Sequence, residues 1–369
     1  MIYLDNAATT KPCEECRRAV CETMETAFGN ASSLHKLGTS SMQIISRARK
    51  TVLAALSGTK TPLDGTVVFT SGATESNNLA ILGSAHRFRP RFGRIVTTAI
   101  EHPSVTKTLV RLEEDGYEVA RLAPRDFGDF TGALIGAVDE NTALLSAMAV
   151  NNETGFKIDV PRLYREVKRK NPKTVVHIDA VQGFLKMPLD GDLISVSGHK
   201  IHAAKGIGAL FVKKGQNILP IISGGGQQGD LRSGTEPAEL IAGFDAAIRA
   251  YRGDTAKFAE LKAHLLDKLA QMEDIGMNSG ADCVPNIINF SVRGVRSEIM
   301  LHSLEEDGIY VSSGSACSRG KKSGVLGALG VSDKDADCAV RVSLCADNTP
   351  EELDALCSKI AKTIERVRR

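Results

Sequence analysis

The chain has 369 residues and a mass of 39.4 kDa, with 42% hydrophobic and 24% charged residues. These proportions are typical of a folded globular protein and exclude an intrinsically disordered chain. Lys and Arg number 46 and Asp and Glu number 44, so the formal net charge is only +2. That balance argues against nucleic acid or an acidic membrane as the partner and favours small ligands.

The chain carries no sequence signal for a membrane or for secretion. No run approaches the ~18 consecutive apolar residues of a membrane span, and the N-terminal MIYLDNAATTKP lacks the features of a signal peptide. We therefore expect a cytoplasmic protein whose eight cysteines are free thiols. Cys13 and Cys16 form a CxxC pair, but no second pair or histidine cluster completes a site, so we expect no metal.

Six short runs of apolar, β-branched residues predict strands in the first two-thirds of the chain. They lie at 66–70, 94–100, 142–150, 174–180, 192–198 and 208–214. Their apolarity is continuous rather than alternating, which strands covered on both faces require, and helical patterns separate several of them. The sequence therefore predicts an α/β fold with a mostly parallel sheet.

The last third of the chain has a different pattern. The glycine-rich segment 224–237 is interpreted as a hinge loop; it contains G-x-G-x-x-G but opens no helix directly, so a dinucleotide site is not expected. A long helix is predicted over 236–273, followed by a smaller α+β domain. A capping box at Thr349 and Glu352 begins the final helix. Its predicted apolar face comprises Leu353, Leu356, Cys357, Ile360, Ile364 and Val367.

Two polar residues follow neighbouring predicted strands. The strand at 192–198 delivers Lys200 at its carboxyl end, where α/β sheets bind ligands, and a lysine amine there can form an imine with an aldehyde cofactor. Asp179 ends the preceding strand, and its carboxylate could pair with the protonated ring nitrogen of pyridoxal 5′-phosphate (PLP). The alternatives are a surface lysine and a helix N-cap aspartate.

A phosphate site is also predicted. Ser71-Gly72-Ala73-Thr74 lies between the strand at 66–70 and a helical pattern, and the backbone N–H groups at a helix start attract phosphate. Simple N-capping by a hydroxyl is the alternative at this position.

Nine segments, in order and across nearly the whole chain, resemble one family. They are LDNAATT (4–10), FGNASSLH (28–35), SGATESNNLAI (71–81), EHPSV (101–105), VNNETG (150–155), HIDAVQ (177–182), SGHKIH (197–202), LRSGTEP (231–237) and SSGSACS (312–318). The family is the cysteine desulfurases, PLP enzymes of the class V aminotransferase group. The resemblance implies a fold-type I PLP-dependent transferase. Its large PLP-binding α/β domain would span 15–255, and 1–14 with 256–369 would form a small α+β domain carrying the catalytic cysteine loop.

The resemblance also implies a role for each matching residue. Lys200 would bind the cofactor aldehyde, Asp179 the ring nitrogen and Gln182 the phenolic oxygen, while His102 would stack on the ring and relay protons. Asn152 would approach the ring oxygen and the substrate, and Arg341 would grip the substrate carboxylate. The phosphate would be held by Ala73, Thr74, Ser197, His199 and, from a second subunit, Thr235. That last role implies a homodimer.

Cys317 is the residue that distinguishes the expected reaction from those of related PLP enzymes. It lies in a Ser/Gly-rich segment followed by Arg319, Lys321 and Lys322, cations that raise the fraction of reactive thiolate; an inert buried cysteine is the alternative. The resemblance implies that L-cysteine gives L-alanine and a persulfide on Cys317. The sulfur would pass to an acceptor protein, such as an iron–sulfur scaffold protein, although transfer to tRNA or thiamin fits equally.

Three other functions would share this PLP site. The first is a selenocysteine lyase or another C–S lyase, and the second is an aminotransferase, which would not need Cys317. The third is not an enzyme but a PLP-binding sulfur-carrier docking module, which would bind the cofactor without producing alanine.

Overall fold

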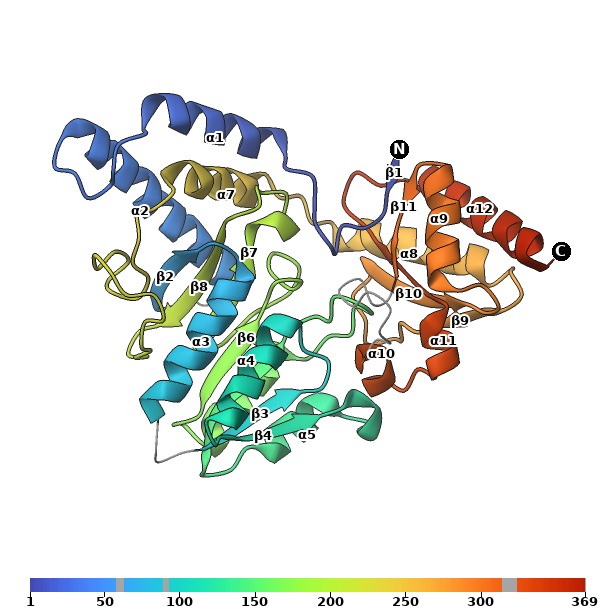
Figure 1. The fold of residues 1–369 in the computed structure, drawn as a ribbon, viewed down its shortest axis with the longest axis horizontal. Helices are drawn as coiled ribbons and strands as arrows, with labels where there is room; N and C mark the ends of the chain where they lie inside the picture. The colour runs from blue at the N-terminus through green and yellow to red at the C-terminus, as the bar shows by residue number, and fades with distance from the viewer. Residues whose placement is uncertain (58–62, 89–92, 314–323, 369) are drawn as a thin grey trace.

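The structure, a computed structural model, describes residues 1–57, 63–88, 93–313 and 324–368. Its larger body contains a seven-stranded sheet (Figure 1), in the order β2-β8-β7-β6-β5-β3-β4. The strands are β2 (Gly65–Thr70), β3 (Arg94–Thr98), β4 (Glu118–Leu122), β5 (Thr142–Met148), β6 (Val175–Asp179), β7 (Leu193–Ser197) and β8 (Gly208–Lys213). Only β8 runs antiparallel to its neighbours.

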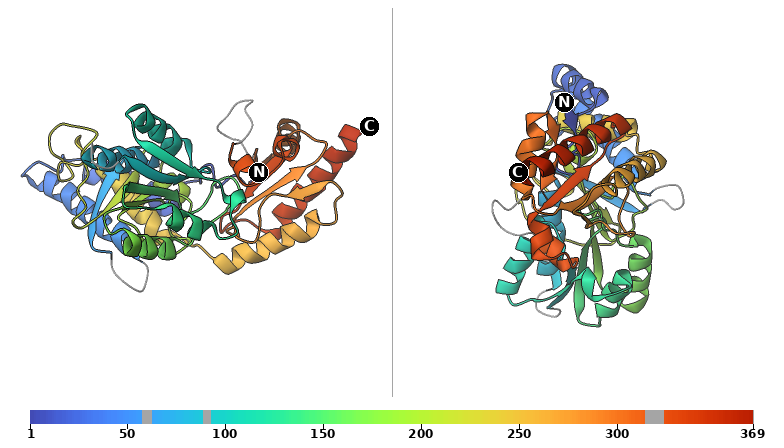
Figure 2. Two further views of the ribbon diagram at one scale, coloured as in Figure 1. Left: turned by 90° about the horizontal axis from the view of Figure 1, so that it is seen from below. Right: turned by 90° about the vertical axis from the view of Figure 1, so that its right-hand side faces the viewer.

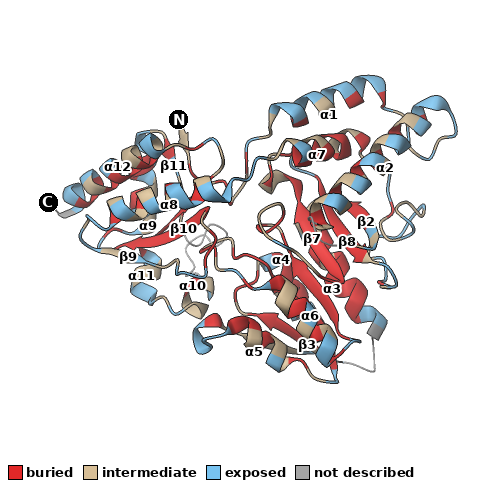
Figure 3. Ribbon diagram, turned by 180° about the vertical axis from the view of Figure 1, so that it is seen from behind, coloured by how far each residue is buried: buried red, intermediate tan, exposed pale blue. Residues whose placement is uncertain are grey.

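Helices cover both faces of this sheet, and Figure 3 shows the buried strands between them. One face packs against α3 (Ala73–Phe88) and α4 (Pro103–Glu114). The other packs against α2 (Lys36–Ser57), α5 (Phe130–Ala137), α6 (Val160–Lys170) and α7 (Ala238–Ala250). Successive residues of β2 illustrate the division, because Val67 belongs to one apolar cluster and Val68 to the other. Helix α1 (Glu14–Thr26) lies on α7 at the outside.

The smaller body has its own apolar core around an antiparallel sheet in the order β12-β13-β10-β9. Its strands are β9 (Ile275–Met277), β10 (Ile287–Val292), β12 (Ser312–Ser313) and β13 (Ala339–Ser343). Its helices are α8 (Thr255–Leu269), α9 (Ser297–Glu306), α10 (Gly324–Ala328), α11 (Asp333–Asp337) and α12 (Pro350–Arg368). Figure 2 shows this body beside the larger one, with both chain ends on it.

The N-terminal segment joins the two bodies. Strand β1 (Ile2–Tyr3) pairs in parallel with β11 (Ile309–Tyr310) of the smaller body, and the Ser343 backbone N–H donates to the carbonyl of Leu4. A few residues later, Thr10 donates its backbone N–H to the His199 carbonyl of the larger body. The residues between these anchors therefore lie where the two bodies meet.

The strand predictions are confirmed: the six predicted runs coincide with the strands β2, β3, β5, β6, β7 and β8, and only β2 begins one residue before its run. The predicted mostly parallel α/β fold is confirmed as well. The sequence analysis missed β4, an edge strand whose residues EVARL are largely polar or half-exposed. Edge strands have only one neighbour and need no continuous apolar run, which explains the missing signal.

Two predictions about residues 224–273 are wrong. The single helix expected over 236–273 is interrupted at residues 251–254, where Asp254 caps α8 by accepting from Ala256 N and Lys257 N. The glycine-rich segment is a loop but not the hinge, because the Gln228 amide bonds both the N–H and the carbonyl of Phe69 on β2. The loop is therefore fixed to the larger sheet, and the chain crosses between the bodies at 251–254.

The final helix begins as predicted. The Thr349 hydroxyl accepts from Glu352 N at 3.4 Å, and the Glu352 carboxylate accepts from Thr349 N at 3.3 Å, which is a reciprocal capping box. Five of the six residues predicted to form its apolar face are buried. The sixth, Val367, is 41% exposed, because the helix extends past the core in its last turn. Within the described ranges no helix combines the length and apolarity needed to cross a bilayer.

Removing the cap of α12 should measurably lower the stability of the smaller body. We expect Thr349→Ala to lower the free energy of unfolding by about 1 kcal/mol, because the first turn of α12 loses one hydrogen-bond acceptor. Denaturant unfolding measures the change. Thr26→Ala, at an exposed helix end, serves as the control and should stay within about 0.5 kcal/mol of the wild type. Equal effects of both substitutions would contradict the capping role.

Candidate functional site

A cavity of about 510 Å³ opens at the carboxyl ends of the parallel strands. Strand β6 ends there at Asp179, β7 ends at Ser197 and leads into a 3-10 turn (Gly198–Lys200), and α3 begins there at Ala73. The cavity is lined by Ala7, Ala8, Ser71, Gly72, Ala73, Thr74, His102, Ser104, Met148, Val150, Asn152, Asp179, Val181, Gln182, Ser197, His199, Lys200, Lys205, Gly206, Ile207 and Arg341. The structure thus brings all but two of the predicted site residues to one place.

Asp179 is the buried acidic group of the cavity, with 4% of its surface exposed. Its carboxylate accepts from Asn77 Nδ2 at 2.8 Å and from Val181 N at 3.0 Å. Both donors are neutral, and no lysine or arginine in the described part of the chain forms an ion pair with it. A buried carboxylate without a counter-charge is costly, so the site favours a cationic ligand group beside Asp179.

The amine of Lys200 is held against the N-terminal segment. Its Nζ donates to the carbonyl oxygens of Ala7 at 2.6 Å and Ala8 at 2.7 Å. Gln182 donates from Nε2 to the same Ala7 carbonyl at 2.8 Å. These contacts place the lysine and Gln182 side by side at one wall of the cavity.

The start of α3 gives the cavity a region that suits an anion. Helix α3 begins at Ala73, so its first N–H groups have no partner within the helix. A Cβ at Gly72 would meet no atom within 4 Å, so the backbone here faces open space. His199 stands nearby as a neutral ring, because burial, with the charges of Lys200 and Lys205, lowers its pKa to about 4.

Arg341 reaches the cavity from β13 of the smaller body. Its Nη2 donates to Asp5 Oδ1 at 2.6 Å and its Nη1 to the carbonyl of Asn152 at 2.9 Å, while its buried Nε has no hydrogen-bond partner. The guanidinium is therefore fixed in place but still has a donor to offer. A guanidinium is well suited to binding a carboxylate.

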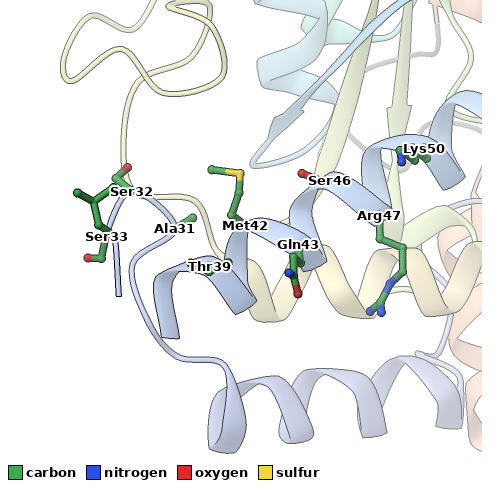
Figure 4. A pocket seen from close by; sticks show the side chains of 10 residues that line it. Ala31, Ser32, Ser33, Thr39, Met42, Gln43, Ser46, Arg47 and Lys50 are labelled. Carbon is green, nitrogen blue, oxygen red and sulfur yellow. The ribbon is translucent and has the colours of Figure 1, made fainter. Parts of the chain in front are cut away.

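Of the predicted site residues that the structure describes, Thr235 does not line the cavity and is exposed outside it. Cys317 lies outside the described residues. The motif at 28–35 also lies away from the cavity. Part of it borders a separate groove of about 540 Å³ along α2 (Figure 4). The groove is lined by Ala31, Ser32, Ser33, Leu34, Thr39, Met42, Gln43, Ser46, Arg47 and Lys50.

Three residues near the cavity were missed by the sequence analysis. Asn77 contacts Asp179, as described above, and Glu101 is a buried carboxyl that accepts from Thr98 Oγ1 at 2.6 Å and Met148 N at 2.8 Å. Lys186 shares a small closed cavity with Lys200, and burial, with the Lys200 charge, lowers its pKa to about 8. Asn77 and Glu101 lie inside quoted motifs, which could have singled them out; Lys186 carries no comparable signal.

The CxxC pair has a structural role. Cys13 is the N-cap of α1, where its sulfur accepts from Cys16 N, and Cys16 is buried. In the part of the chain that the structure describes, no three His, Cys, Asp or Glu side chains are grouped closely enough to hold a metal.

Comparison with known proteins establishes the family. The family model "Aminotransferase class-V" matches residues 2–356, so the chain belongs to this family. A "NifS/IcsS protein homolog" of Lactobacillus delbrueckii subsp. bulgaricus is 38% identical over 96% of this chain and 94% of its own length. A "Cysteine desulfurase IscS" of Serratia proteamaculans is 37% identical over 100% of this chain and 93% of its own.

The fold has close matches among solved structures too. A "NifS-like protein" superposes with a TM-score of 0.90 at 33% identity, covering 99% of each chain. The family and the fold-type I architecture expected from the nine motifs are therefore confirmed. The roles of the individual site residues stay predictions.

Glu101 should make stability depend on pH. Burial, reinforced by the Asp179 charge and opposed by the bond from Thr98, raises its pKa from 4.5 to about 8. Between these values the folded chain holds a proton that the unfolded chain has lost, so stability falls as pH rises. The Glu101→Gln variant has no carboxyl at this position and does not lose stability in this way. Its free energy of unfolding should exceed that of the wild type by roughly 1–3 kcal/mol at pH 7, but by little at pH 4.5.

Denaturant unfolding across this pH range measures the difference. Glu114→Gln, at an exposed position at the end of helix α4, is the control for replacing a glutamate that is not buried. Parallel stability curves for Glu101→Gln and the wild type would show that Glu101 is charged in the folded protein.

Proposed function

We propose that this chain is a cysteine desulfurase that uses PLP to convert L-cysteine into L-alanine and a persulfide on Cys317. The observation that carries the proposal is that Asp179, Lys200 and Arg341 converge on one cavity, in a chain whose relatives are named cysteine desulfurases. A carboxylate, an amine and a guanidinium match a ring nitrogen, an aldehyde and a substrate carboxylate respectively.

The residues present fit PLP. The cofactor combines a basic ring nitrogen, an aldehyde and a phosphate, and the cavity offers a counterpart for each. The buried Asp179 lacks a cationic partner among the described residues, Lys200 provides an amine, and the open α3 N-terminus provides backbone donors. We propose that Ala73, Thr74, Ser197 and His199 hold the phosphate and that Gln182 binds the phenolic oxygen.

PLP, when bound, supplies an electron sink for the bonds around the substrate α-carbon. Asp179 would keep the ring nitrogen protonated, because its buried carboxylate stabilises a neighbouring positive charge. Lys200 would hold the aldehyde and move a proton at the substrate α-carbon. The flat ring of His102 lines the same cavity and would stack on the cofactor.

Substrate binding would fall to residues contributed by both bodies. Arg341 would bind the carboxylate of cysteine, with Asp5 and the Asn152 carbonyl keeping its guanidinium in place. Asn152 would contact the substrate from the other body. The Cys317 thiolate would then attack the substrate sulfur, forming an S–S bond while the Cβ–S bond of the substrate breaks. The electron pair of the broken bond would stay with the carbon skeleton, which takes up protons to give alanine. An acceptor protein would remove the outer sulfur of the persulfide; an iron–sulfur scaffold protein is one such acceptor.

We also propose a homodimer. Thr235 is exposed and away from the cavity, which suits a residue that completes the phosphate site of a second subunit. The α2 groove and the exposed Phe28 and Leu34 beside it provide an apolar surface for such a contact.

The packing of α7 on α1 and of α8 on α12 supports domains at 15–255 and at 1–14 with 256–369. The free thiols of the seven described cysteines fit a cytoplasmic protein.

The direct test combines two products. Purified protein is incubated with PLP and L-cysteine, and alanine and protein-bound sulfane sulfur are measured together. We expect both to appear, Lys200→Ala to lose both, and Cys317→Ser to keep the visible absorbance of bound cofactor but lose the bound sulfur. Cys21→Ser, at an exposed thiol on α1, is the control and should behave as the wild type.

Other outcomes would favour another function. Full turnover by Cys317→Ser would contradict the persulfide step, and preference for selenocysteine or cystine over cysteine would indicate a different lyase. A requirement for a keto acid would indicate an aminotransferase. Cofactor binding without alanine would indicate a docking module.

Arg341 should control substrate affinity rather than cofactor binding. We expect Arg341→Lys to raise the KM for cysteine at least about tenfold, because an ammonium cannot reproduce the two-point contact of a guanidinium. The bound-cofactor absorbance should stay unchanged. Steady-state kinetics and the absorbance spectrum measure the two effects, and a variant with wild-type KM would exclude Arg341 from the substrate site.

A further inference from the structure

One ring nitrogen of His102 is fully occupied by the start of its own helix. His102 is the N-cap of α4, and its Nδ1 lies 3.1 Å from Ser104 N and 2.9 Å from Ser104 Oγ. A backbone N–H can only donate a hydrogen bond, so Nδ1 must accept and carries no proton. In a neutral imidazole the single proton then lies on Nε2.

Asn77 determines how the Ser104 hydroxyl points. Asn77 Nδ2 donates to Ser104 Oγ at 2.9 Å and to Asp179 Oδ2 at 2.8 Å, which uses both of its hydrogens. Because Ser104 Oγ accepts from the amide, its own hydrogen can point to His102 Nδ1. The reversed amide would place an oxygen against the Asp179 carboxylate, which is repulsive, so the network allows only this orientation.

The network is shielded from water and extends from the cavity floor to the ring. Asn77 is completely buried, and Asp179 and Ser104 are buried as well. In such an environment water does not replace a lost hydrogen bond. Any other orientation of these side chains would leave a buried polar group unpaired and would therefore cost free energy. The chain of contacts Asp179–Asn77–Ser104–His102 thus couples the proposed partner of the ring nitrogen to the residue proposed to stack on the ring.

The surroundings of His102 lower the pKa of its ring on balance. Burial lowers the pKa of His102, the Asp179 carboxylate opposes this shift, and the Lys200 ammonium adds to it. The other titratable or charged groups that line the cavity are His199, Lys205 and Arg341, and the neighbouring residue in the chain is Glu101.

We propose that Asn77 and Ser104 are positioning residues that lock His102 in the tautomer protonated on Nε2, so that it presents a fixed N–H donor to the cavity. Protonating Nδ1 would break its contact with the Ser104 backbone N–H, which caps the helix, and would force the Ser104 hydroxyl to turn its hydrogen away from the ring. His102 therefore acts as a donor and stacking surface rather than a proton relay. If the chain is the proposed desulfurase, proton movement at the substrate α-carbon then falls to Lys200.

The test reads the tautomer directly. The full-length protein is labelled with ¹⁵N-histidine, and long-range ¹H–¹⁵N NMR spectra are recorded from about pH 5 to 8, without and then with PLP. The His102 signals are assigned by their loss in His102→Gln. We expect an unprotonated Nδ1 and a protonated Nε2 throughout this range.

Two variants test the network. Ser104→Ala keeps the backbone N–H but removes the hydroxyl, and Asn77→Ala frees the hydroxyl to turn away. Both should raise the His102 pKa by about one unit, a tenfold larger protonated fraction, because the Ser104 backbone N–H is then the only contact that favours an unprotonated Nδ1. Thr108→Ala is the control, because Thr108 Oγ1 contacts Asn78 and the backbone carbonyl of Ser104 but neither the Ser104 hydroxyl nor His102.

A protonated Nδ1 in the wild type would overturn the proposal, and this result does not require Ser104→Ala or Asn77→Ala to fold. An unchanged His102 spectrum in Ser104→Ala and Asn77→Ala would also overturn it. Neither measurement uses cysteine or alanine, so failure of the proposed desulfurase activity would be recognised separately in the product assay.

Discussion

The burial of the Asp179 carboxylate constrains the rest of the site. Placing a carboxylate among strands and helices is unfavourable unless donors surround it, and here two neutral donors, Asn77 Nδ2 and Val181 N, provide part of that compensation. Helix α3 must therefore approach the end of β6 closely enough for Asn77 to reach the carboxylate. The same approach sets the first turn of α3, and with it the proposed phosphate site, at the mouth of the cavity.

The cavity depends equally on contacts between the two bodies. Arg341 comes from the smaller sheet, yet its guanidinium bonds the Asn152 carbonyl in the larger body and Asp5 in the N-terminal segment. A small apolar cluster of Ala7, Val150, Val284 and Ile287 packs at the same junction. The position of Arg341 therefore depends on how the two bodies are joined, and a shift of either body would displace its guanidinium.

The sequence predicted the central strands and most of the cavity because each depends on local pattern or on a motif. Continuous apolar runs identify strands that are covered on both faces; Asp179 is the last residue of one such strand, and Lys200 comes three residues after the end of another. The break between α7 and α8 was missed because the apolar periodicity continues on both sides of it. Asn77, Glu101 and Lys186 were missed because their significance comes from burial beside residues distant in sequence.

The hydrogen bonds between Lys200 and the N-terminal segment affect when the cavity forms during folding. The Ala7 and Ala8 carbonyls contact a lysine more than 190 positions later, and Asp5 contacts an arginine 336 positions later. Closing such long loops is entropically costly, and contacts of this kind form late in folding. A ribosome must have produced the chain through Arg341 before Asp5 can meet that partner, so the cavity becomes complete only after the smaller body has been synthesised.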